Sequence, residues 1–473
     1  MTAAALLPSW ARPSGGAQRR RPVRRTLPHL VLGATFFALY AIASYARYYR
    51  ADAASWDLGI FTEAVKGWAT RGVPTVDIKG PGFNLLGDHW SPVLALLAPV
   101  WWVWPSPVML LTVQAGLFGW SAGIVSDTAA RFLGRGNGLL LGVAYGLSFG
   151  LQNAVDVEFH EIAFAVPLLA VVGRQLLLRR WHRAVYWALP LLLVKEDLGL
   201  TVAVVGVLVW WLGKRRLLGA GTVLLGLGGT LLEIGVLIPA FNPHHRYDYW
   251  VMAPHGGHGL AWWAGWQVTQ LVKWKTILLT FGITAFAAIR SPLALLAVPG
   301  LAWRMLATNS QYWTTWWHYS ATLMPIVFLA GIDGLTRLET SRTWRLRTFA
   351  HHGPPVIAAI GLAVCWATPL GTAQLADSAT WRPGPFGTAV RAAARLVPSG
   401  VTVESWHPGL AALAARDDVY WVGGDPAPPA YALLTPDGGQ IDGMVAFEER
   451  LHPGARYRLI YGRAGVGLLQ LQP

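Results

Sequence analysis

The feature that most constrains this chain is a series of long apolar segments joined by short charged loops. Acidic residues of the first three-quarters gather in one set of loops, and arginines gather in the loops between them. About 20 apolar residues suffice to cross a bilayer, and loops rich in lysine and arginine stay in the cytoplasm. The alternation therefore predicts an all-α polytopic membrane protein whose acidic loops share the outer face.

Composition supports this class and excludes others. The 473 residues are 54% hydrophobic and 13% charged, whereas a soluble domain carries about 25% charged residues. The net charge of +14 lies in short loops and in the N-terminal tail, so topology explains it and no nucleic-acid partner is expected. A single cysteine, Cys365, leaves no disulfide framework and no cysteine-based metal site.

The N-terminus sets the orientation. Residues 1–28 carry six arginines and no acid, and an apolar run follows at 29–49 without a small-residue cleavage site. We expect a basic cytoplasmic tail, an uncleaved first span and a first outer loop at 50–106. Within this loop, Trp56 to Ala69 has the apolar spacing of a helix lying on the membrane surface.

About eleven crossings are expected within a membrane domain of residues 29–372. Residues 91–104 are interpreted as re-entrant, because a full crossing would move Arg131 and Arg135 outside. Segment 184–195 is short for a span, so 184–213 is alternatively one tilted helix. The remaining spans are expected at about 107–130, 137–152, 161–178, 197–213, 217–240, 273–289, 291–306, 318–336 and 353–371.

Residues 373–473 have the pattern of a small extracytoplasmic α/β domain. Apolar runs shorten and glycine and proline become more frequent. Helices are predicted at 386–397 and 408–415, and strands at 401–405, 419–422, 431–434 and 457–461.

Two sites in the first outer loop are candidates for chemistry. Asp57 follows the first span, where a carboxylate either caps a helix or takes part in catalysis. Asp88 and His89 adjoin Pro92, where such a pair either shuttles a proton, orients a phosphate or holds a metal, or stabilises a turn.

Two further acidic clusters lie in later outer loops. Asp156, Glu158 and His160 offer oxygen and nitrogen ligands to Mg²⁺ or Mn²⁺, with Glu161 beside them, although a solvated loop explains them equally. Lys195, Glu196 and Asp197 interrupt an apolar stretch. Charges at membrane depth indicate a substrate site unless they pair internally, and Lys195 would either bind a phosphate or neutralise Glu196.

The last candidates combine basic and aromatic side chains. Arg246 lies in the loop 241–272, and His318 and Tyr319 open a later span. Such residues suit a sugar ring and an anionic headgroup, and they equally suit the aromatic belt of a membrane interface. No nucleotide phosphate loop is present, so no nucleotide cofactor is expected and an outer-face enzyme needs a donor already in the membrane.

The ordered motifs resemble a known family. They are Trp56-Asp57-Leu58-Gly59-Ile60-Phe61, Leu86-Gly87-Asp88-His89-Trp90-Ser91-Pro92, His160-Glu161 with Val166-Pro167, Lys195-Glu196-Asp197, and Trp317-His318-Tyr319-Ser320 with Pro325. This set is similar to a bacterial family of multi-spanning membrane proteins with a domain of unknown function. That family is similar in plan to the GT-C glycosyltransferases, and the resemblance covers roughly residues 30–370.

The resemblance implies a cell-membrane glycosyltransferase that uses a polyprenyl-phosphate sugar donor and an envelope glycan, lipid or protein acceptor. Asp57 falls where GT-C enzymes carry an acid as base or metal ligand, and Asp88 and His89 fall where they contact donor or acceptor. The alternative hypothesis is a transporter or lipid flippase with Lys195-Glu196-Asp197 as its charged site, which the absence of repeated halves disfavours. A non-catalytic envelope scaffold is a third possibility.

Overall fold

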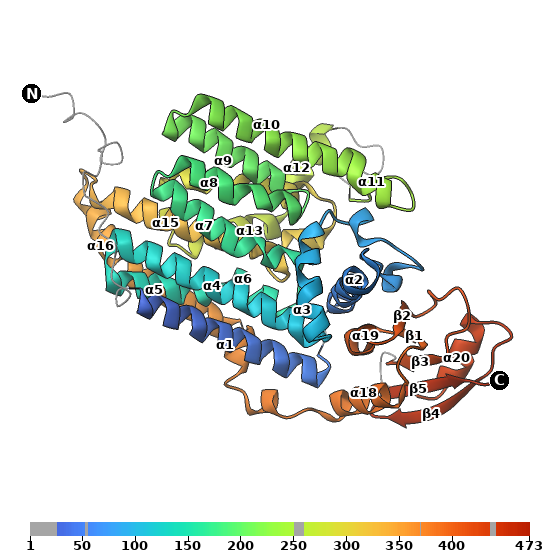
Figure 1. Cartoon of the computed structure of the whole chain (residues 1–473). Coiled ribbons are helices and arrows are strands. Elements are labelled where there is room, and N and C mark those ends of the chain that lie inside the picture. The colour runs from blue at the N-terminus through green and yellow to red at the C-terminus, as the bar shows by residue number, and fades with distance from the viewer. Residues whose placement is uncertain (1–25, 53–54, 250–259, 369, 436–440) are drawn as a thin grey trace, which may run out of the picture.

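The computed structural model describes residues 26–52, 55–249, 260–368, 370–435 and 441–473 (Figure 1). Most of the predicted basic tail, residues 1–25, lies outside these described residues. In Figure 1 a layer of long helices occupies one side of the molecule, and the C-terminal sheet lies at the far end beside α2.

The helical part contains sixteen α-helices among the described residues. They are α1 (Leu27–Arg50), α2 (Asp57–Arg71), α3 (Ala98–Val103), α4 (Pro107–Leu133), α5 (Arg135–Gly146), α6 (Phe149–Asp156), α7 (Ala165–Leu177), α8 (Trp181–Ala188), α9 (Leu198–Gly213), α10 (Arg216–Leu232), α11 (Ile238–Phe241), α12 (Leu260–Thr269), α13 (Leu271–Gly282), α14 (Val298–Leu306), α15 (Leu323–Glu339) and α16 (Trp344–Ala367).

Six helical segments of the described chain are long and apolar enough to cross a membrane. They are Leu27–Arg50, Pro107–Leu133, Arg135–Asp156, Arg216–Phe241, His318–Glu339 and Trp344–Ala367. Each of the other predicted spans coincides with shorter helices, such as Leu198–Gly213. The membrane class of the prediction is therefore supported, and the count of eleven crossings stays a prediction.

Close helix contacts hold this bundle together. Gly33 of α1 faces Gly119 of α4 so closely that a Cβ on Gly33 would lie 2.7 Å from the carbonyl oxygen of Gly119. Small residues permit such approach between helices in a membrane, where packing replaces the hydrophobic effect as the source of stability. The crossing of α1 and α4 matters for function because α1 ends next to the candidate site.

The C-terminal residues form a five-stranded sheet with flanking helices. Its strands are β1 (Thr402–Ser405), β2 (Asp418–Trp421), β3 (Tyr431–Leu434), β4 (Tyr457–Arg463) and β5 (Val466–Leu471), in the order β2-β1-β3-β5-β4. Strand β1 is parallel to β2 and β3, and β5 is antiparallel to β3 and β4. The helices are α17 (Gly371–Gln374), α18 (Pro385–Leu396), α19 (His407–Ala414) and α20 (Met444–Leu451).

Helix α2 does not lie freely on a membrane surface as expected. It packs on α19, and one apolar core joins α2, the first outer loop and the C-terminal sheet. Glu63 of α2 accepts hydrogen bonds from the backbone N–H groups of Ile78 and Val419, and Lys66 Nζ donates to the carbonyl oxygen of Asp417. The apolar face predicted to meet lipid meets the C-terminal domain instead.

Candidate active site

Asp57 is the first residue of α2. Ser55 Oγ donates a hydrogen bond to Asp57 Oδ2 at 2.5 Å and accepts one from the backbone N–H of Asp57. His160 Nε2 lies 3.2 Å from the same Asp57 oxygen. The carboxylate is thus held by a hydroxyl and an imidazole, and three-quarters of its side chain is shielded from solvent.

His160 reaches Asp57 because the chain reverses sharply after α6. That helix ends at Asp156, and Glu158 adopts a left-handed backbone conformation with φ of 69°. The backbone N–H of His160 then donates to Gln114 Oε1 of α4, and its ring stacks on the ring of His318 with centroids 3.5 Å apart. This stacking contact joins the loop after α6 to the segment before α15.

The surroundings of Asp57 keep its carboxylate ionised. Burial by itself raises the pKa of Asp57, but the charge of His160 and the hydrogen bonds from His160 and Ser55 outweigh burial and hold the pKa below its ordinary value. A carboxylate in this state accepts a hydrogen bond from a bound hydroxyl group throughout the neutral range.

Asp88 and His89 are neighbours in the sequence, but they belong to two different networks of hydrogen bonds and ion pairs. Lys79 Nζ lies 2.5 Å from Asp88 Oδ2, and the hydroxyl of Tyr249 donates to Asp88 Oδ1 at 2.9 Å. Burial raises the pKa of Asp88, but the charges of His89 and Lys79 outweigh it, so the pKa lies below its ordinary value. His89 Nδ1 lies 2.8 Å from Glu196 Oε1, and its ring stacks on Tyr249.

The charged triplet at 195–197 lies where two helices break. Helix α8 ends at Ala188, a 3₁₀ turn covers 189–193, and α9 begins at Leu198, so 184–213 is not one continuous helix. Lys195 Nζ pairs with Glu161 Oε1 at 2.8 Å rather than with its neighbour Glu196. Glu196 instead accepts hydrogen bonds from the backbone N–H of Trp90 and the hydroxyl of Tyr247.

These networks surround one cavity of about 410 Å³. Eight of the site residues predicted from the sequence line it: Asp57, Asp88, His89, His160, Glu161, Lys195, His318 and Tyr319. Glu196 lies behind His89, and Asp197 lines a smaller neighbouring cavity together with Glu196 and Tyr247. The predicted residues therefore converge from four separate loops.

Arg246 does not join this cavity. It pairs with Asp248 at 2.7 Å, and 71% of its side chain is exposed. The same loop supplies Tyr249 to the central cavity and Tyr247 to the smaller neighbouring cavity. The sequence therefore indicated the correct loop, but Arg246 is not the residue that lines the cavity.

The metal site predicted from Asp156, Glu158 and His160 is not assembled among the described residues. Asp156 Oδ2 accepts a hydrogen bond from the backbone N–H of Gly371, Glu158 lines a different cavity, and His160 faces Asp57. Because α6 ends at Asp156 and the backbone is left-handed at Glu158, the three side chains diverge. The donor set does not fit a Mg²⁺ or Mn²⁺ ion.

Sequence reasoning missed several residues of the central cavity. They include Ser55, Lys79, Tyr249, Asn309, Tyr312 and His407. Lys79 is the one basic residue between Asp77 and Asp88, and this isolation in an acidic loop was a usable signal. His407 belongs to α19 of the C-terminal domain, so no local pattern connects it with Asp57.

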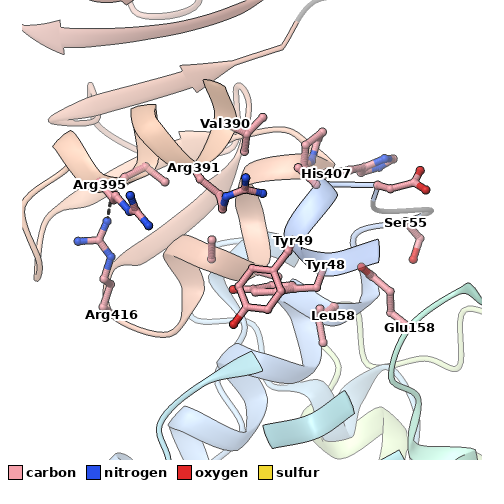
Figure 2. A pocket seen from close by; sticks show the side chains of 17 residues that line it. Tyr48, Tyr49, Ser55, Leu58, Glu158, Val390, Arg391, Arg395, His407 and Arg416 are labelled. Atoms are coloured by element: carbon pink, nitrogen blue, oxygen red, sulfur yellow. Dashed lines mark hydrogen bonds between the residues drawn. The ribbon is translucent and has the colours of Figure 1, made fainter. Parts of the chain in front are cut away.

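A second cavity of about 340 Å³ lies between the end of α1, the start of α2 and helices α18 and α19 (Figure 2). Its basic side chains are Arg391, Arg395 and Arg416, and Tyr48, Tyr49 and Glu158 line the opposite wall. One buried guanidinium nitrogen of Arg391 has no hydrogen-bond partner. Ser55 and His407 line both cavities, so the two spaces adjoin beside Asp57.

Comparisons with known proteins agree with this architecture. The model of a family described as "Predicted membrane protein (DUF2079)" matches residues 47–418. The structure is similar to the crystal structure of ArnT from Cupriavidus metallidurans bound to undecaprenyl phosphate, with a TM-score of 0.55 and 11% identity over 94% of this chain and 98% of that chain.

A second structure of that protein, in the apo state, matches with a TM-score of 0.46 and 12% identity over 87% of this chain and 92% of that chain. No curated protein matches the sequence. At 11% identity, the similarity to the undecaprenyl-phosphate complex shows the fold alone.

Proposed function

The chain belongs to the DUF2079 family of predicted membrane proteins, and we propose that it is an integral-membrane glycosyltransferase. It moves a sugar from a polyprenyl-phosphate donor to an envelope glycan, lipid or protein acceptor at the outer face. The observation that carries the proposal is the central cavity, which an ionised Asp57 paired with His160 lines together with Lys79 and Lys195. The fold shared with a protein crystallised with undecaprenyl phosphate supports the same donor class.

Asp57 is assigned as the base. The acceptor hydroxyl attacks the anomeric carbon of the donor sugar while its proton passes to the Asp57 carboxylate. The bond between the anomeric carbon and the phosphate oxygen breaks, and the electron pair leaves with the polyprenyl phosphate. Attack opposite to the leaving group inverts the configuration at this carbon. His160 and Ser55 hold Asp57 in the geometry for this step.

The leaving phosphate gains negative charge and needs cationic groups. Lys79 and Lys195 both line the central cavity. Lys79 forms an ion pair with Asp88, and Lys195 forms one with Glu161. These ion pairs place the ammonium groups before the donor binds. Since the predicted metal ligands diverge, no step of this proposal uses a metal ion.

The acceptor is assigned to the second cavity. This space adjoins the first beside Asp57, through Ser55 and His407, so a molecule held there can present a hydroxyl to the carboxylate. Its arginine side chains favour an acceptor with negative charge. The C-terminal domain thus forms one wall of the acceptor cavity.

The test is a transfer assay of the purified protein in detergent. Polyprenyl-phosphate sugars are offered with envelope extract as acceptor, and released polyprenyl phosphate is measured. We expect Asp57→Asn to lower turnover by about 10²–10⁴-fold, the usual contribution of a general base. The matched control is Asp418→Asn, which removes a surface carboxylate paired with Arg71 and leaves the cavity intact.

Turnover retained by Asp57→Asn would remove this residue from the mechanism. No release from any donor, together with movement of a polyprenyl-phosphate sugar across sealed vesicles, would identify the protein as a lipid transporter instead.

A further inference from the structure

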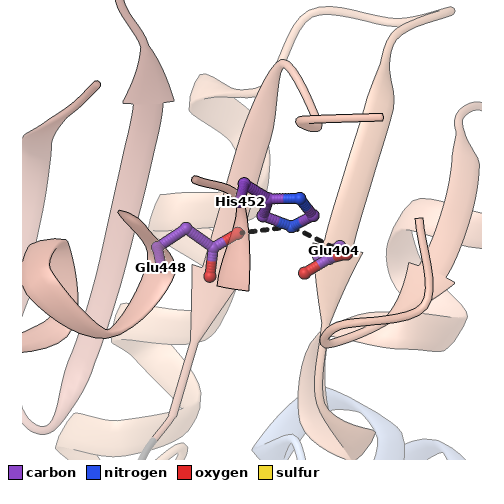
Figure 3. Close-up of side chains that lie close together, drawn as sticks. All are labelled: Glu404, Glu448 and His452. Carbon is purple, nitrogen blue, oxygen red and sulfur yellow. Dashed lines mark ion pairs between the residues drawn. The ribbon is translucent and has the colours of Figure 1, made fainter. Parts of the chain in front are cut away.

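Three ionisable side chains meet inside the C-terminal domain, away from both cavities. Glu404 lies on β1, Glu448 on α20, and His452 directly after α20 (Figure 3). All three are buried, and their ligand atoms lie within 4.8 Å of one another. Glu448 and His452 are four residues apart at the end of a helix, a spacing that places both side chains on one face.

Glu404 is fixed by the backbone of a neighbouring turn. Its Oε2 accepts a hydrogen bond from the N–H of Gly423 at 2.9 Å, and its Oε1 accepts one from the N–H of Asp425 at 3.0 Å. The same Oε1 lies 3.2 Å from His452 Nε2. Figure 3 shows the imidazole between the two carboxylates, with Nε2 directed at both.

The carboxylate of Glu448, unlike that of Glu404, accepts no hydrogen bond from the backbone of the described residues. Its side chain is fully buried, and neither carboxylate oxygen has a hydrogen-bond partner. His452 Nε2 lies 3.7 Å from Glu448 Oε1, which is too far for a hydrogen bond. Burial of a carboxylate without partners is strongly unfavourable, so native proteins pair such groups or use them to bind a cation.

We propose that Glu404, Glu448 and His452 bind a divalent transition-metal ion, with Zn²⁺ as the preferred species. One imidazole nitrogen and two carboxylate oxygens form a donor set that suits Zn²⁺, whereas Mg²⁺ and Ca²⁺ favour oxygen ligands alone. Two carboxylates, a neutral imidazole and a doubly charged cation sum to zero, which removes the unbalanced charge from the interior.

The role of the ion is structural. It joins β1, the turn at 423–425 and the end of α20, three parts of the C-terminal domain that are otherwise held by separate contacts. None of the three ligands lines the central cavity or the second cavity. The inference therefore stands whether or not the protein transfers sugars.

A shared proton between the two carboxylates is the competing account. The experiment uses the full-length protein in detergent, stripped with a chelator and dialysed against Zn²⁺. Bound zinc is measured by mass spectrometry and the unfolding temperature by intrinsic fluorescence. The variants are Glu448→Gln and His452→Asn, and the control is the adjacent Glu449→Gln.

Wild type and Glu449→Gln are expected to bind one more zinc per chain than either ligand variant, and zinc raises their unfolding temperature. Each ligand variant binds zinc at this site at least about tenfold more weakly. Equal zinc content in all four proteins would overturn the proposal. So would a Glu448→Gln protein whose stability matches wild type with and without zinc, because a shared proton alone predicts that result.

Discussion

Two carboxylates at the candidate site are shifted in opposite directions by their neighbours. Burial raises the pKa of Asp57, but the charge of His160 and the hydrogen bonds from His160 and Ser55 outweigh burial and lower it. Glu158 is also buried, but burial dominates and raises its pKa to about 8, although Arg47 acts in the other direction. Environments that separate the pKa values of two acids allow one to stay charged while the other stays neutral.

This difference predicts how acceptor binding depends on pH. The charge of Glu158 interacts with the charges of Arg47, Asp57 and Asp52, and Arg391 lines the same cavity as Glu158. Near neutral pH it is protonated, and it becomes a carboxylate as the pH rises through about 8. For an anionic acceptor, we therefore expect the KM to rise above this pH, because a negative charge appears in the cavity wall.

The measurement is the acceptor KM of wild type and Glu158→Gln between pH 6 and about 9.5, a range that brackets the shifted pKa. The glutamine variant stays neutral, so its KM should not show the rise. A rise of equal size in both proteins would assign the effect to another group or to the acceptor itself.

At the scale of elements, α2 connects the membrane helices to the C-terminal domain through one buried acid. Glu63 accepts hydrogen bonds from the N–H of Ile78 in the first outer loop and from the N–H of Val419 in β2. Burial raises its pKa to about 8, so it is largely neutral at pH 7. The residue holds three segments in register at the helix that begins with Asp57.

Two substitutions of Glu63 test how much its two hydrogen bonds stabilise the fold. Glu63→Ala leaves two buried N–H groups without acceptors, which should destabilise the fold by about 1–3 kcal/mol for each group. Glu63→Gln keeps one acceptor oxygen and turns its NH₂ group toward the second N–H, so it should be destabilised less than the alanine variant. The check is the thermal unfolding midpoint in detergent, and an alanine variant as stable as the glutamine variant would contradict the bridging role.

The pH dependence gives a second readout for the same residue. Because the folded pKa is raised above the ordinary carboxyl value, the folded state holds its proton more tightly. This contribution to stability is complete below the unfolded pKa of about 4.3 and is lost as the pH rises through about 8. Glu63→Gln should lack this loss.

Local patterns predicted most of the elements, and the failures have physical causes. Strands β1 to β4 and helices α18 and α19 follow from apolar periodicity and lie within two residues of their predicted bounds. Strand β5 was missed because its hairpin turn uses Ala464 and Gly465, both with positive φ, rather than the usual Asn-Gly pair. The partner of α2 was missed because Lys66 and Asp417 are 351 positions apart.

The sequence predicted many of the residues that line the central cavity, but it did not predict which of their side chains interact with each other. Short outer loops gave Asp57, Asp88, His160 and Lys195 because charges at a membrane surface are few. The partners could not be read locally: His89 meets Glu196 across 107 positions, and Lys195 meets Glu161 across 34. Pairing of Lys195 with Glu196 was one of two alternatives from the sequence, but the helix break directs the two side chains to different partners.

At the scale of the whole molecule, one apolar core fixes the C-terminal domain against the first outer loop. Any membrane orientation must therefore place both on the same side. We then expect the basic residues around the connection of α15 and α16 on the opposite side: Arg337 in α15, Arg342 in the connection, and Arg345 and Arg347 in α16. The positive-inside rule assigns this opposite side to the cytoplasm.

The single native cysteine allows a direct test of this orientation. Cys365→Ser gives a cysteine-free chain, to which Ser399→Cys in the C-terminal domain or Arg342→Cys in the basic loop is added; both positions are exposed. A membrane-impermeant maleimide should label Ser399→Cys in intact spheroplasts and Arg342→Cys only after the membrane is permeabilised. The reverse labelling pattern would place the Asp57 cavity on the cytoplasmic side. The basic loops would then lie on the outer side, against the positive-inside rule. Transfer from a donor at the outer face would then be excluded, because the base and the substrate would lie on opposite sides of the membrane.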